Sequence, residues 1–335
     1  MSNTYRLGAS NLEVTPIGLG TWQFSQSRGL AGSYWAAIPQ ERVVEIVQAT
    51  IAGGINWFDT AEVYGNGASE ESLAGALREL GVPRESYLVA DKWFPAFRTA
   101  RSIAKTFPAR ERALAAIAGA VTATAAVDLH QIHQPFSFSS VERQAAEMGR
   151  LVTEGRVRAV GVSNFNEGRM RRAHAELARV GVPLASNQMR YSLIDREIER
   201  DGVLNAAHEL GITIIAYSPL SQGILTGRFH DGDDIHASHG PRKWMRRFKP
   251  AGLAATRPLV ECLRSVAGTH GCTPAQVALA WTVQMHGTRI VAIPGASSAE
   301  QAASNAAALA VRLSAQELAE LDEKGREAER SLKKR

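Results

Sequence analysis

The chain has 335 residues, of which 45% are hydrophobic and 21% are charged, a balance typical of a globular protein with a large buried core. Its formal net charge of +5 is a mild excess, and because no aromatic and basic module accompanies it, we expect no nucleic-acid partner. No apolar run is long enough to span a membrane, and the N-terminus does not resemble a secretion signal, so we expect a cytoplasmic protein without a membrane partner. The only two cysteines, Cys262 and Cys272, imply no disulfide framework and fit a reducing compartment.

Short apolar runs recur along the chain, and most of them are followed by an amphipathic segment. Most of the runs are continuously apolar, which predicts strands that are buried on both faces, as in a parallel sheet. Eight runs occur, at 17–22, 55–60, 86–92, 127–133, 157–164, 184–189, 212–219 and 289–295.

The segments between the runs carry helix signals. Helices are predicted over 39–54, 69–81, 139–155, 166–181 and 273–287. We expect the second of these to begin on Ser69 as its cap, and the last to begin on Thr273 with Pro274 at the first helical position.

Eight strand-and-helix repeats predict the α/β class and a single (β/α)8 TIM barrel, which closes without sheet edges. A doubly wound sheet is the alternative, but the lone Gly18-x-Gly20 lacks the rest of a dinucleotide fingerprint. A turn at 8–11 predicts an N-terminal hairpin that covers the barrel floor. We expect the barrel domain to span 1–328 and the basic residues 329–335 to form a frayed, disordered tail.

Two segments, 93–110 and 221–257, exceed what a minimal barrel needs. Both follow predicted strands, so we expect them at the rim, where barrel enzymes build their active sites. The basic stretch 241–249 within the second segment is either a solvated loop or a place where Arg246 or Arg247 folds over phosphates.

Polar residues stand at the ends of six of the eight runs. Because the carboxyl ends of barrel strands meet at one rim, these side chains are expected to face each other. They are Asp59, Lys92, His133, Ser163 with Asn164, Asn187 with Gln188, and Tyr217.

Four of the residues near these ends form a set that suits proton transfer. A tyrosine has an unperturbed pKa of about 10, and the ammonium of Lys92 would stabilise the phenolate of Tyr64 and lower that pKa. Asp59 would keep Lys92 charged, and His133 would orient a substrate oxygen. Taken singly, Asp59 is equally well read as a strand-end cap and His133 as a core histidine; together they predict a proton donor aimed at a carbonyl.

The chain resembles the aldo-keto reductases along nearly its whole length. The matching pieces occur in the family's order: GLGTW, GINWFDTAEVYG, DLHQIHQP, VRAVGVSNF, NQMRYS, AYSPLSQGILTGRF, TPAQVALAW and IPGASSAEQAASNAAAL. The resemblance implies a catalytic tetrad of Asp59, Tyr64, Lys92 and His133. It also implies NADPH-dependent reduction of a small-molecule carbonyl substrate, an aldehyde or ketone, to an alcohol, with no metal required.

The same resemblance implies the cofactor-binding residues. Ser163, Asn164 and Gln188 would hold the nicotinamide carboxamide, and Tyr217 would stack on its ring. The loop from Ser218 would wrap the pyrophosphate, and the segment from Gly295 would bind the adenosine end at a helix N-terminus. The full set is Gly20, Thr21, Trp22, Asp59, Ser163, Asn164, Gln188, Tyr217, Ser218, Pro219, Leu220, Gln222, Gly223, Arg247, Gly295, Ser297, Gln301 and Asn305.

Several positions depart from the family's pattern. Gly295 and Gln301 are not basic, and Ser304 replaces a usual glutamate, so NADP is expected while NAD stays possible. Asp91 stands where the family usually has Ser or Thr, and strand alternation predicts that it points away from Lys92.

The substrate pocket is expected to be lined by Trp22, Tyr64, Trp93, His133 and Trp244. Two other functions fit parts of the same pattern. One is an NADP-binding, redox-reading regulatory subunit with little turnover, and the other is a barrel isomerase or aldolase with Lys92 as Schiff base. The sequence does not indicate an oligomeric state.

Overall fold

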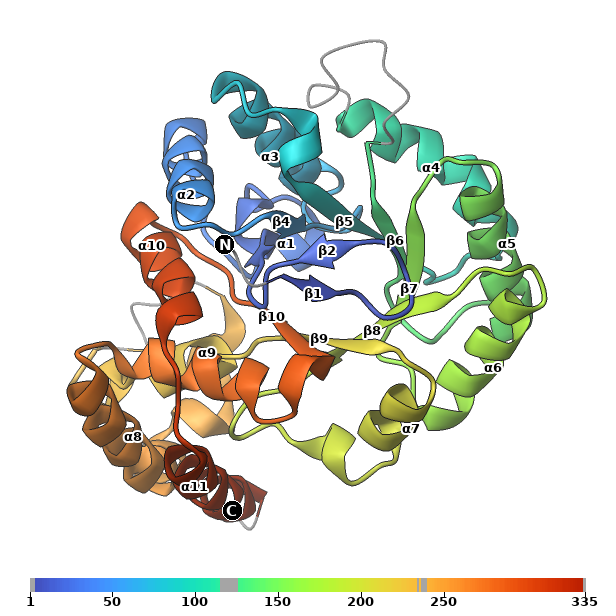
Figure 1. Cartoon of the computed structure of the whole chain (residues 1–335). Coiled ribbons are helices and arrows are strands. Elements are labelled where there is room, and N and C mark those ends of the chain that lie inside the picture. The colour runs from blue at the N-terminus through green and yellow to red at the C-terminus, as the bar shows by residue number, and fades with distance from the viewer. Residues whose placement is uncertain (1–3, 115–125, 234, 236–239, 334–335) are drawn as a thin grey trace.

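The computed structural model describes residues 4–114, 126–233, 235 and 240–333. Eight strands, all parallel, lie in the order β10-β9-β8-β7-β6-β5-β4-β3, and bridges from Ile17 to Ala292 and from Gly20 to Gly295 close the sheet into a barrel (Figure 1). Each predicted run overlaps one strand, so the (β/α)8 prediction is confirmed. The strands are β3 (Leu19–Gly20), β4 (Trp57–Asp59), β5 (Leu88–Trp93), β6 (Leu129–Ile132), β7 (Ala159–Ser163), β8 (Leu184–Arg190), β9 (Thr213–Tyr217) and β10 (Ile290–Ile293).

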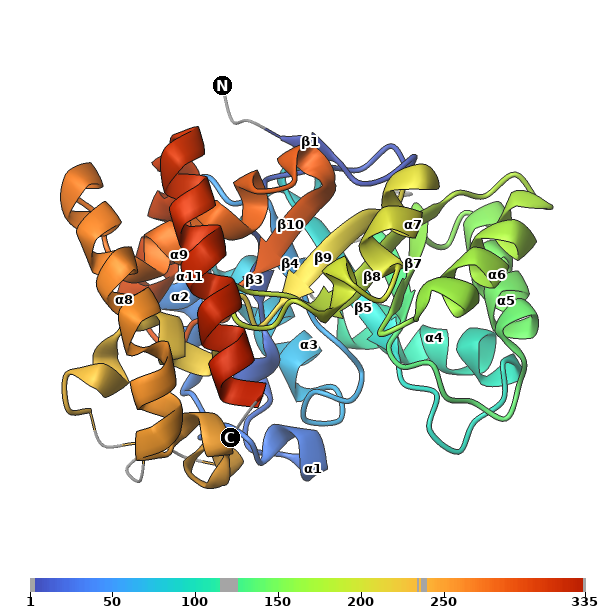
Figure 2. The same cartoon turned by 90° about the horizontal axis from the view of Figure 1, so that it is seen from below.

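The predicted N-terminal hairpin is present as β1 (Tyr5–Arg6) paired antiparallel with β2 (Glu13–Val14). Its Leu7, Leu12 and Val14 belong to the same buried cluster as Trp57 and the inward side chains of the barrel strands. Figure 2 shows the hairpin at one end of the barrel, opposite the end where the long connecting loops lie. The hairpin therefore seals the floor, and the other end is open for a site.

Helices surround the barrel (Figure 1), and their inner faces form a second, larger core against the outer faces of the strands. The predicted helices correspond to α2, α3, α5, α6 and α9. The helices are α1 (Gly29–Gly32), α2 (Gln40–Ala52), α3 (Ala68–Glu79), α4 (Arg101–Ala113), α5 (Val141–Thr153), α6 (Glu167–Ala178), α7 (Val203–Glu209), α8 (Pro250–His270), α9 (Pro274–Gln284), α10 (Ala299–Ala307) and α11 (Ala315–Lys333).

The start of α3 differs from the prediction. Its cap is Gly67, which has a left-handed backbone with φ of 97°, and no side chain caps the helix. Ser69 lies inside the helix, and its hydroxyl donates to the carbonyl of Thr21 at 2.7 Å. A glycine cap was favoured over the serine because the chain must turn sharply after Tyr64, and glycine adopts positive φ without steric cost.

The segment 93–110 is a rim loop only in its first part. From Arg101 it forms α4, the helix that follows β5, and this helix contains Pro108. Pro108 removes one backbone donor within the helix, and α4 was not among the helices predicted from the sequence.

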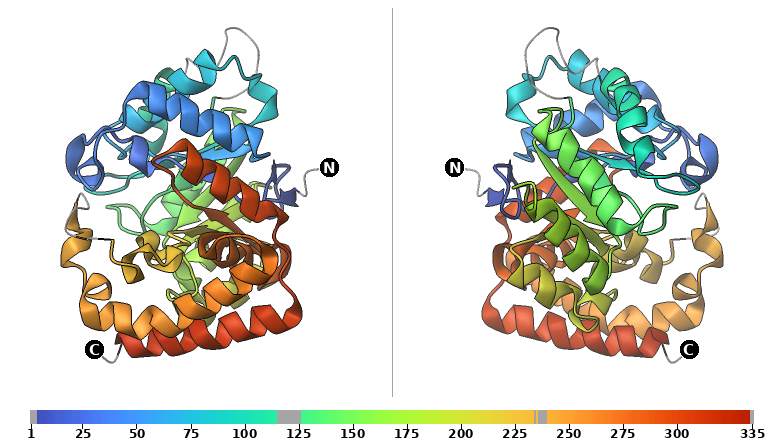
Figure 3. Two further views of the ribbon diagram at one scale, coloured as in Figure 1. Left: turned by 90° about the vertical axis from the view of Figure 1, so that its left-hand side faces the viewer. Right: turned by 90° about the vertical axis from the view of Figure 1, so that its right-hand side faces the viewer.

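The tail prediction is wrong for residues 329–333, because α11 continues to Lys333. Glu329 is buried and accepts hydrogen bonds from Arg200 at 2.6 Å, and its carboxylate pairs with Lys333 at 3.0 Å. Figure 3 shows α11 running along the outside of the helical layer, where it packs on α8. Lys334 and Arg335 lie outside the described residues, and the domain boundary at residue 328 stays a prediction.

The two cysteines are both free, with Cys262 buried in α8 and Cys272 partly buried after it. Within the ranges that the structure describes, no helix is both long enough and apolar enough to cross a membrane.

The close packing of Gly18 on Trp57 gives a stability prediction. A Cβ at Gly18 would lie 2.3 Å from the buried Trp57 ring, whose Nε1 donates to the Thr15 carbonyl at 2.9 Å. We expect Gly18→Ala to lower the free energy of unfolding by about 1–3 kcal/mol through overpacking. The matched control is Gly168→Ala in α6, where a Cβ meets nothing within 4 Å. That change should be neutral or stabilising by up to about 1 kcal/mol. Equal urea midpoints for the two variants would contradict this account of the floor.

Candidate active site

A buried ion pair lies at the carboxyl ends of β4 and β5. Lys92 Nζ donates to Asp59 Oδ1 and, at 2.7 Å, to the carbonyl of Thr60, and it lies 3.5 Å from the hydroxyl of Tyr64. The side chains of Lys92 and Asp59 are 0% and 1% exposed. Asp59, Tyr64 and Lys92, predicted from separate parts of the chain, are therefore in direct contact.

Asp59 is held by more than the lysine. Its second oxygen, Oδ2, accepts hydrogen bonds from Gln188 at 2.8 Å and Gln131 at 3.3 Å. These amides come from β8 and β6, so side chains of four strands meet at one carboxylate. Gln131 was not singled out in the sequence, because it lies within an apolar run and not at its end.

Burial and the neighbouring charges set the protonation states of three groups. Burial alone would lower the pKa of Lys92, but Asp59 and Tyr64 outweigh it, and the net pKa is raised. Burial raises the pKa of Tyr64 and Lys92 opposes that rise, so the net shift is opposite to the lowering we expected from the ammonium alone. Burial and Lys92 together hold the pKa of His133 well below its usual range. Near neutral pH the site thus contains an ammonium, a neutral phenol and a neutral imidazole.

Three aromatic rings stand around the Tyr64 hydroxyl. His133, which directly follows β6, lies edge-on to Tyr64 at 5.6 Å between ring centroids, and Phe94 lies edge-on to His133 at 5.7 Å. Trp22 stacks on Tyr64 at 6.0 Å. The Nδ1 atom of His133 is buried, and none of the described residues gives it a hydrogen-bond partner. The imidazole is therefore oriented by ring packing and not by a carboxylate.

The polar residues at the ends of β7, β8 and β9 form one connected group. Asn164 Nδ2 donates to the carbonyl of His133 at 3.3 Å and to Ser163 Oγ at 3.0 Å, and Asn164 Oδ1 accepts from the Tyr217 hydroxyl at 3.0 Å. Ser163 Oγ donates to the carbonyl of Gln188 at 3.0 Å. The left-handed backbone of Asn164, with φ of 59°, turns its amide toward this rim. Amides and hydroxyls here offer the donors and acceptors that a primary amide needs.

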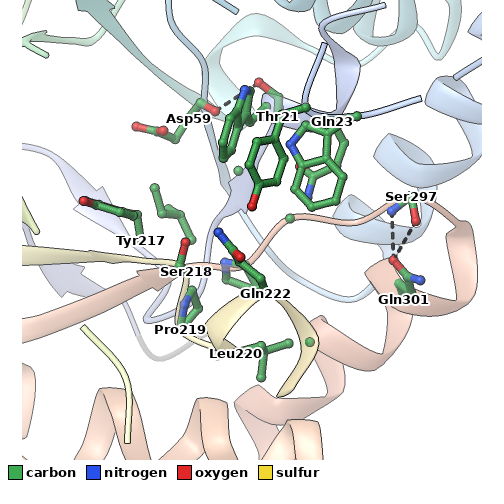
Figure 4. Close-up of a pocket in the computed structure, with 18 of the residues that line it drawn as sticks. Thr21, Gln23, Asp59, Tyr217, Ser218, Pro219, Leu220, Gln222, Ser297 and Gln301 are labelled. Carbon is green, nitrogen blue, oxygen red and sulfur yellow. Dashed lines mark hydrogen bonds between the residues drawn. The ribbon is translucent and has the colours of Figure 1, made fainter. Parts of the chain in front are cut away.

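One cavity of about 1250 Å³ lies at the open end of the barrel, and Figure 4 shows Asp59 and Tyr217 among the residues that line it. Tyr64, His133, Ser163, Asn164 and Gln188 line it as well, whereas Lys92 does not. Most residues predicted for a cofactor line it. They are Gly20, Thr21, Trp22, Asp59, Ser163, Asn164, Gln188, Tyr217, Ser218, Pro219, Leu220, Gln222, Gly223, Gly295, Ser297, Gln301 and Asn305.

One wall of the cavity has features of an anion site that the sequence did not reveal. Arg228 and Arg242 both line it, and Arg242 is only 8% exposed. The Arg242 guanidinium packs over the Trp35 ring at 4.7 Å, while its Nε has no hydrogen-bond partner in the part of the chain that the structure describes. Burial and Arg228 lower its pKa. Gln222 has a left-handed backbone with φ of 60°, and its buried Oε1 has no hydrogen-bond partner within the same described ranges.

The far end of the cavity lies at the N-terminus of α10. Gln301 Oε1 accepts hydrogen bonds from the Ser297 N–H at 2.9 Å and from its Oγ at 3.1 Å, as Figure 4 shows. Arg42 of α2 also lines this cavity. The pKa of Glu300 in the first turn of α10 is lowered mainly by hydrogen bonds from Ser298 and its own backbone, and the charge of Arg42 contributes in the same direction. A basic residue therefore stands near this helix start, although Gly295 and Gln301 are not basic.

Three predicted site residues lie elsewhere. Arg247 makes a bidentate pair with Asp195, at 3.0 and 3.1 Å, and does not line the cavity. Trp93 follows Lys92 on β5, so alternation turns it to the helix side, where its Nε1 donates to Ser102 Oγ at 3.1 Å. Trp244 is 69% exposed and lies outside the cavity lining. These assignments to the cofactor site and substrate pocket are corrected here.

The described part of the chain holds no cluster of three or more His, Cys, Asp or Glu side chains that could bind a metal ion.

Comparison with known proteins shows which family the sequence belongs to. Residues 16–326 match the model described as the Aldo/keto reductase family. An uncharacterized oxidoreductase of Mycobacterium tuberculosis is 39% identical over 308 residues, which cover 91% of this chain and 87% of that protein. Probable aldo-keto reductase 1 of Glycine max is 31% identical over 324 residues, covering 95% of this chain and 87% of that protein.

Solved structures share the fold. A glycerol dehydrogenase from Gluconobacter oxydans has a TM-score of 0.79 and 26% identity, covering 96% of this chain and 95% of that one. An aldo/keto reductase from Klebsiella pneumoniae, solved in complex with NADP and acetate, has a TM-score of 0.71 and 29% identity, with coverage of 96% and 95%.

The buried ion pair yields a prediction about stability. Lys92→Met leaves Asp59 charged and buried without its cation, which should cost about 3–5 kcal/mol of unfolding free energy. Adding Asp59→Asn to that variant should recover part of the loss, because the uncompensated charge is gone. Urea unfolding of wild type, both single variants and the double variant measures the coupling. Additive effects of the two substitutions would show that Asp59 and Lys92 do not stabilise each other.

Proposed function

Because the chain belongs to the aldo/keto reductase family and is an NAD(P)H-dependent oxidoreductase, we propose that it reduces an aldehyde or ketone to an alcohol with Tyr64 as the proton donor. The observation that carries this proposal is the contact of Lys92 with both Asp59 and Tyr64 at one end of a large cavity. A carbonyl oxygen near the Tyr64 hydroxyl would meet a neutral phenol, with an ammonium directly behind it.

The raised pKa of Tyr64 is consistent with an acid that is used once per turnover. Burial keeps the phenol protonated near neutral pH, so the proton is available when a carbonyl arrives. As the proton leaves, the phenolate gains the attraction of Lys92 Nζ, 3.5 Å away. Asp59 keeps that ammonium charged. The neutral His133 imidazole, edge-on to Tyr64, would orient the substrate oxygen by a hydrogen bond.

The residues around the cavity suit a dinucleotide. When bound, the reduced nicotinamide supplies the hydride for the carbonyl carbon. Asn164 and Gln188 would hold its carboxamide, and the Tyr217 ring would cover one face. Gln222 Oε1 and Arg242 Nε are buried polar atoms without a hydrogen-bond partner among the described residues, which supports a polar ligand on this wall.

Phosphate groups would be held by arginines other than the one predicted. Arg242 and Arg228 face the same space beside Gln222 and Gly223, and two guanidiniums close together favour an anion between them. At the other end, Arg42 and the amides at the start of α10 would meet the 2′-phosphate of NADP. This arrangement favours NADP over NAD.

The substrate would be an apolar or ring-bearing carbonyl compound. The cavity beside the Tyr64 hydroxyl is walled by Trp22, Phe94 and His133, and its outer rim continues from Phe94 to Phe136, whose rings lie 6.1 Å apart. Aromatic side chains bind rings and apolar chains through contact area and edge-to-face packing.

A Schiff-base function for Lys92 is disfavoured by the same electrostatics. An amine nucleophile needs a lowered pKa, whereas Asp59 and Tyr64 raise that of Lys92. The ammonium is also occupied by Asp59 and the Thr60 carbonyl.

Replacing the phenol tests the proposal directly. Tyr64→Phe should lower kcat for NADPH-dependent reduction of a panel of aliphatic and aromatic aldehydes by about 10²–10⁴-fold, since general acid catalysis contributes that much. NADPH binding, followed by quenching of protein fluorescence, should stay within a few-fold of wild type. Tyr64→Phe with wild-type turnover would rule out the proton-donor assignment. Wild-type protein that oxidises bound NADPH only once would favour the regulatory subunit instead.

The two arginine assignments are separated by a pair of variants. Arg242→Met should raise the Kd for NADPH by about 10- to 100-fold, because hydrogen bonds to charged groups contribute ~1.5–3 kcal/mol. Arg247→Met should change that Kd less, since its guanidinium is paired with Asp195. Isothermal titration at fixed salt measures both. A larger effect at Arg247 than at Arg242 would restore the assignment made from the sequence.

A further inference from the structure

A cluster of charged side chains is buried on the outer side of the barrel, directly behind Tyr64 and Lys92. We call Glu62, Glu70, Asp91 and Arg110 the Arg110 cluster. Glu62, Glu70 and Asp91 are buried, and Arg110 has a side chain that is 13% exposed. Arg110 Nη1 donates to Glu62 Oε2 at 2.8 Å, and its Nε lies 2.6 Å from Glu70 Oε1. None of these residues lines the active-site cavity.

The cluster is attached to the catalytic groups through short stretches of backbone. Glu62 lies two residues before Tyr64 in the turn that carries the phenol, and its N–H donates to the Lys92 carbonyl at 3.3 Å. Its other oxygen, Oε1, accepts the Phe94 N–H at 2.6 Å and a bond from Arg98. Asp91 precedes Lys92 on β5, and its Oδ1 accepts the Lys92 N–H at 2.7 Å.

Arg110 is the more buried of the two cations that neighbour the three acids of the Arg110 cluster. Burial raises the pKa of Glu70 to about 9, and Asp91 adds to that rise while Arg110 opposes it. Burial likewise raises the pKa of Asp91 to about 7, again opposed by Arg110. The second cation, Arg98, is at the exposed edge of the cluster, with a side chain that is 37% exposed. Without Arg110, Glu62 would keep Arg98 and the Phe94 N–H as partners of Oε1 but would lose the partner of Oε2, beside two further buried acids.

We propose that Arg110 is a positioning residue: by holding Glu62, it fixes the turn that places the Tyr64 hydroxyl against Lys92. Arg110 belongs to α4, whereas the turn that carries Tyr64 lies between β4 and α3. The turn after Asp59 is therefore held on both sides. On the inner side Lys92 binds Asp59 and the Thr60 carbonyl, and on the outer side Arg110 binds Glu62. This inference rests on the proposed function of Tyr64 as the acid.

A neighbouring arginine provides a matched control. Arg156 pairs with Glu111 of α4 at 2.7 Å and stacks over Phe107 of the same helix at 4.8 Å. It has no hydrogen bond to the Tyr64 turn within the described residues. Removing it should perturb α4 without releasing Glu62.

The test compares Arg110→Met with Arg156→Met in steady-state aldehyde reduction. Arg110→Met should lower kcat by about 10²-fold, the effect of misplacing a catalytic group by about 1 Å. Its KM for NADPH should stay within a few-fold of wild type. The phenol of Tyr64 faces three titratable groups, Lys92, Asp59 and Tyr217, and of these only Lys92 lowers its pKa. If Tyr64 is displaced, its phenolate loses the attraction of Lys92 and its pKa rises. The alkaline limb of the plot of kcat against pH should therefore move to higher pH. Arg156→Met should leave both kcat and the profile unchanged.

Two further variants separate positioning from loss of fold. Arg110→Lys keeps the charge but not both contacts, so it should restore part of kcat. Glu62→Gln keeps the shape of the side chain and should show a smaller fall in kcat with the same direction of pH shift.

Each outcome bears on the proposal. Two results would overturn the positioning role of Arg110 while leaving the proposed function intact. One is a fall in kcat of Arg110→Met that is fully explained by a smaller fraction of folded protein. The other is an equal fall in kcat of Arg156→Met. A wild-type enzyme without NADPH-dependent turnover would remove the proposed function and this inference with it.

Discussion

The buried pair of Lys92 and Asp59 is the constraint around which the upper half of the barrel is organised. Two ions taken out of water lose several kcal/mol of hydration each, so each needs partners on all sides. Asp59 obtains them from Gln188 and Gln131 as well as from Lys92, and Lys92 obtains one from the Thr60 carbonyl. Because these partners come from β4, β5, β6 and β8, the pair fixes four strand ends relative to one another.

This polar upper layer contrasts with the lower half of the barrel. There the interior is apolar, filled by Trp57 and by the leucines of the hairpin, and Gly18 packs so close to the Trp57 ring that a Cβ would not fit. The floor can be packed for stability alone, whereas the top keeps charged and neutral groups in defined protonation states. Burial raises the pKa of Tyr64 and lowers that of His133, so both are neutral beside the Lys92 ammonium.

The sequence predicted the barrel and most of the cavity because both depend on chain order. A polar residue that ends an apolar strand must lie at the rim once the strands are parallel, and this placed Asp59, His133 and Tyr217 around one cavity. Lys92 contacts Asp59 at the same rim without lining the cavity. Features that depend on a partner distant in sequence were missed. Asp195 binds Arg247, so Arg247 does not line the cavity. Arg242 has no ion pair with Asp195 and lines the cavity instead.

The same distinction explains Asp91. Alternation along β5 correctly turned it away from the catalytic side of the strand, but alternation says nothing about what lies behind the strand. Behind the strand, Asp91 is fully buried near Arg110 of α4, a helix that was not among those predicted from the sequence. Burial raises the pKa of this acid, and a positive charge in the helical layer opposes that rise. Arg110 provides that charge and also binds Glu62, so a substitution on the outer face of β5 is coupled to the turn that carries Tyr64.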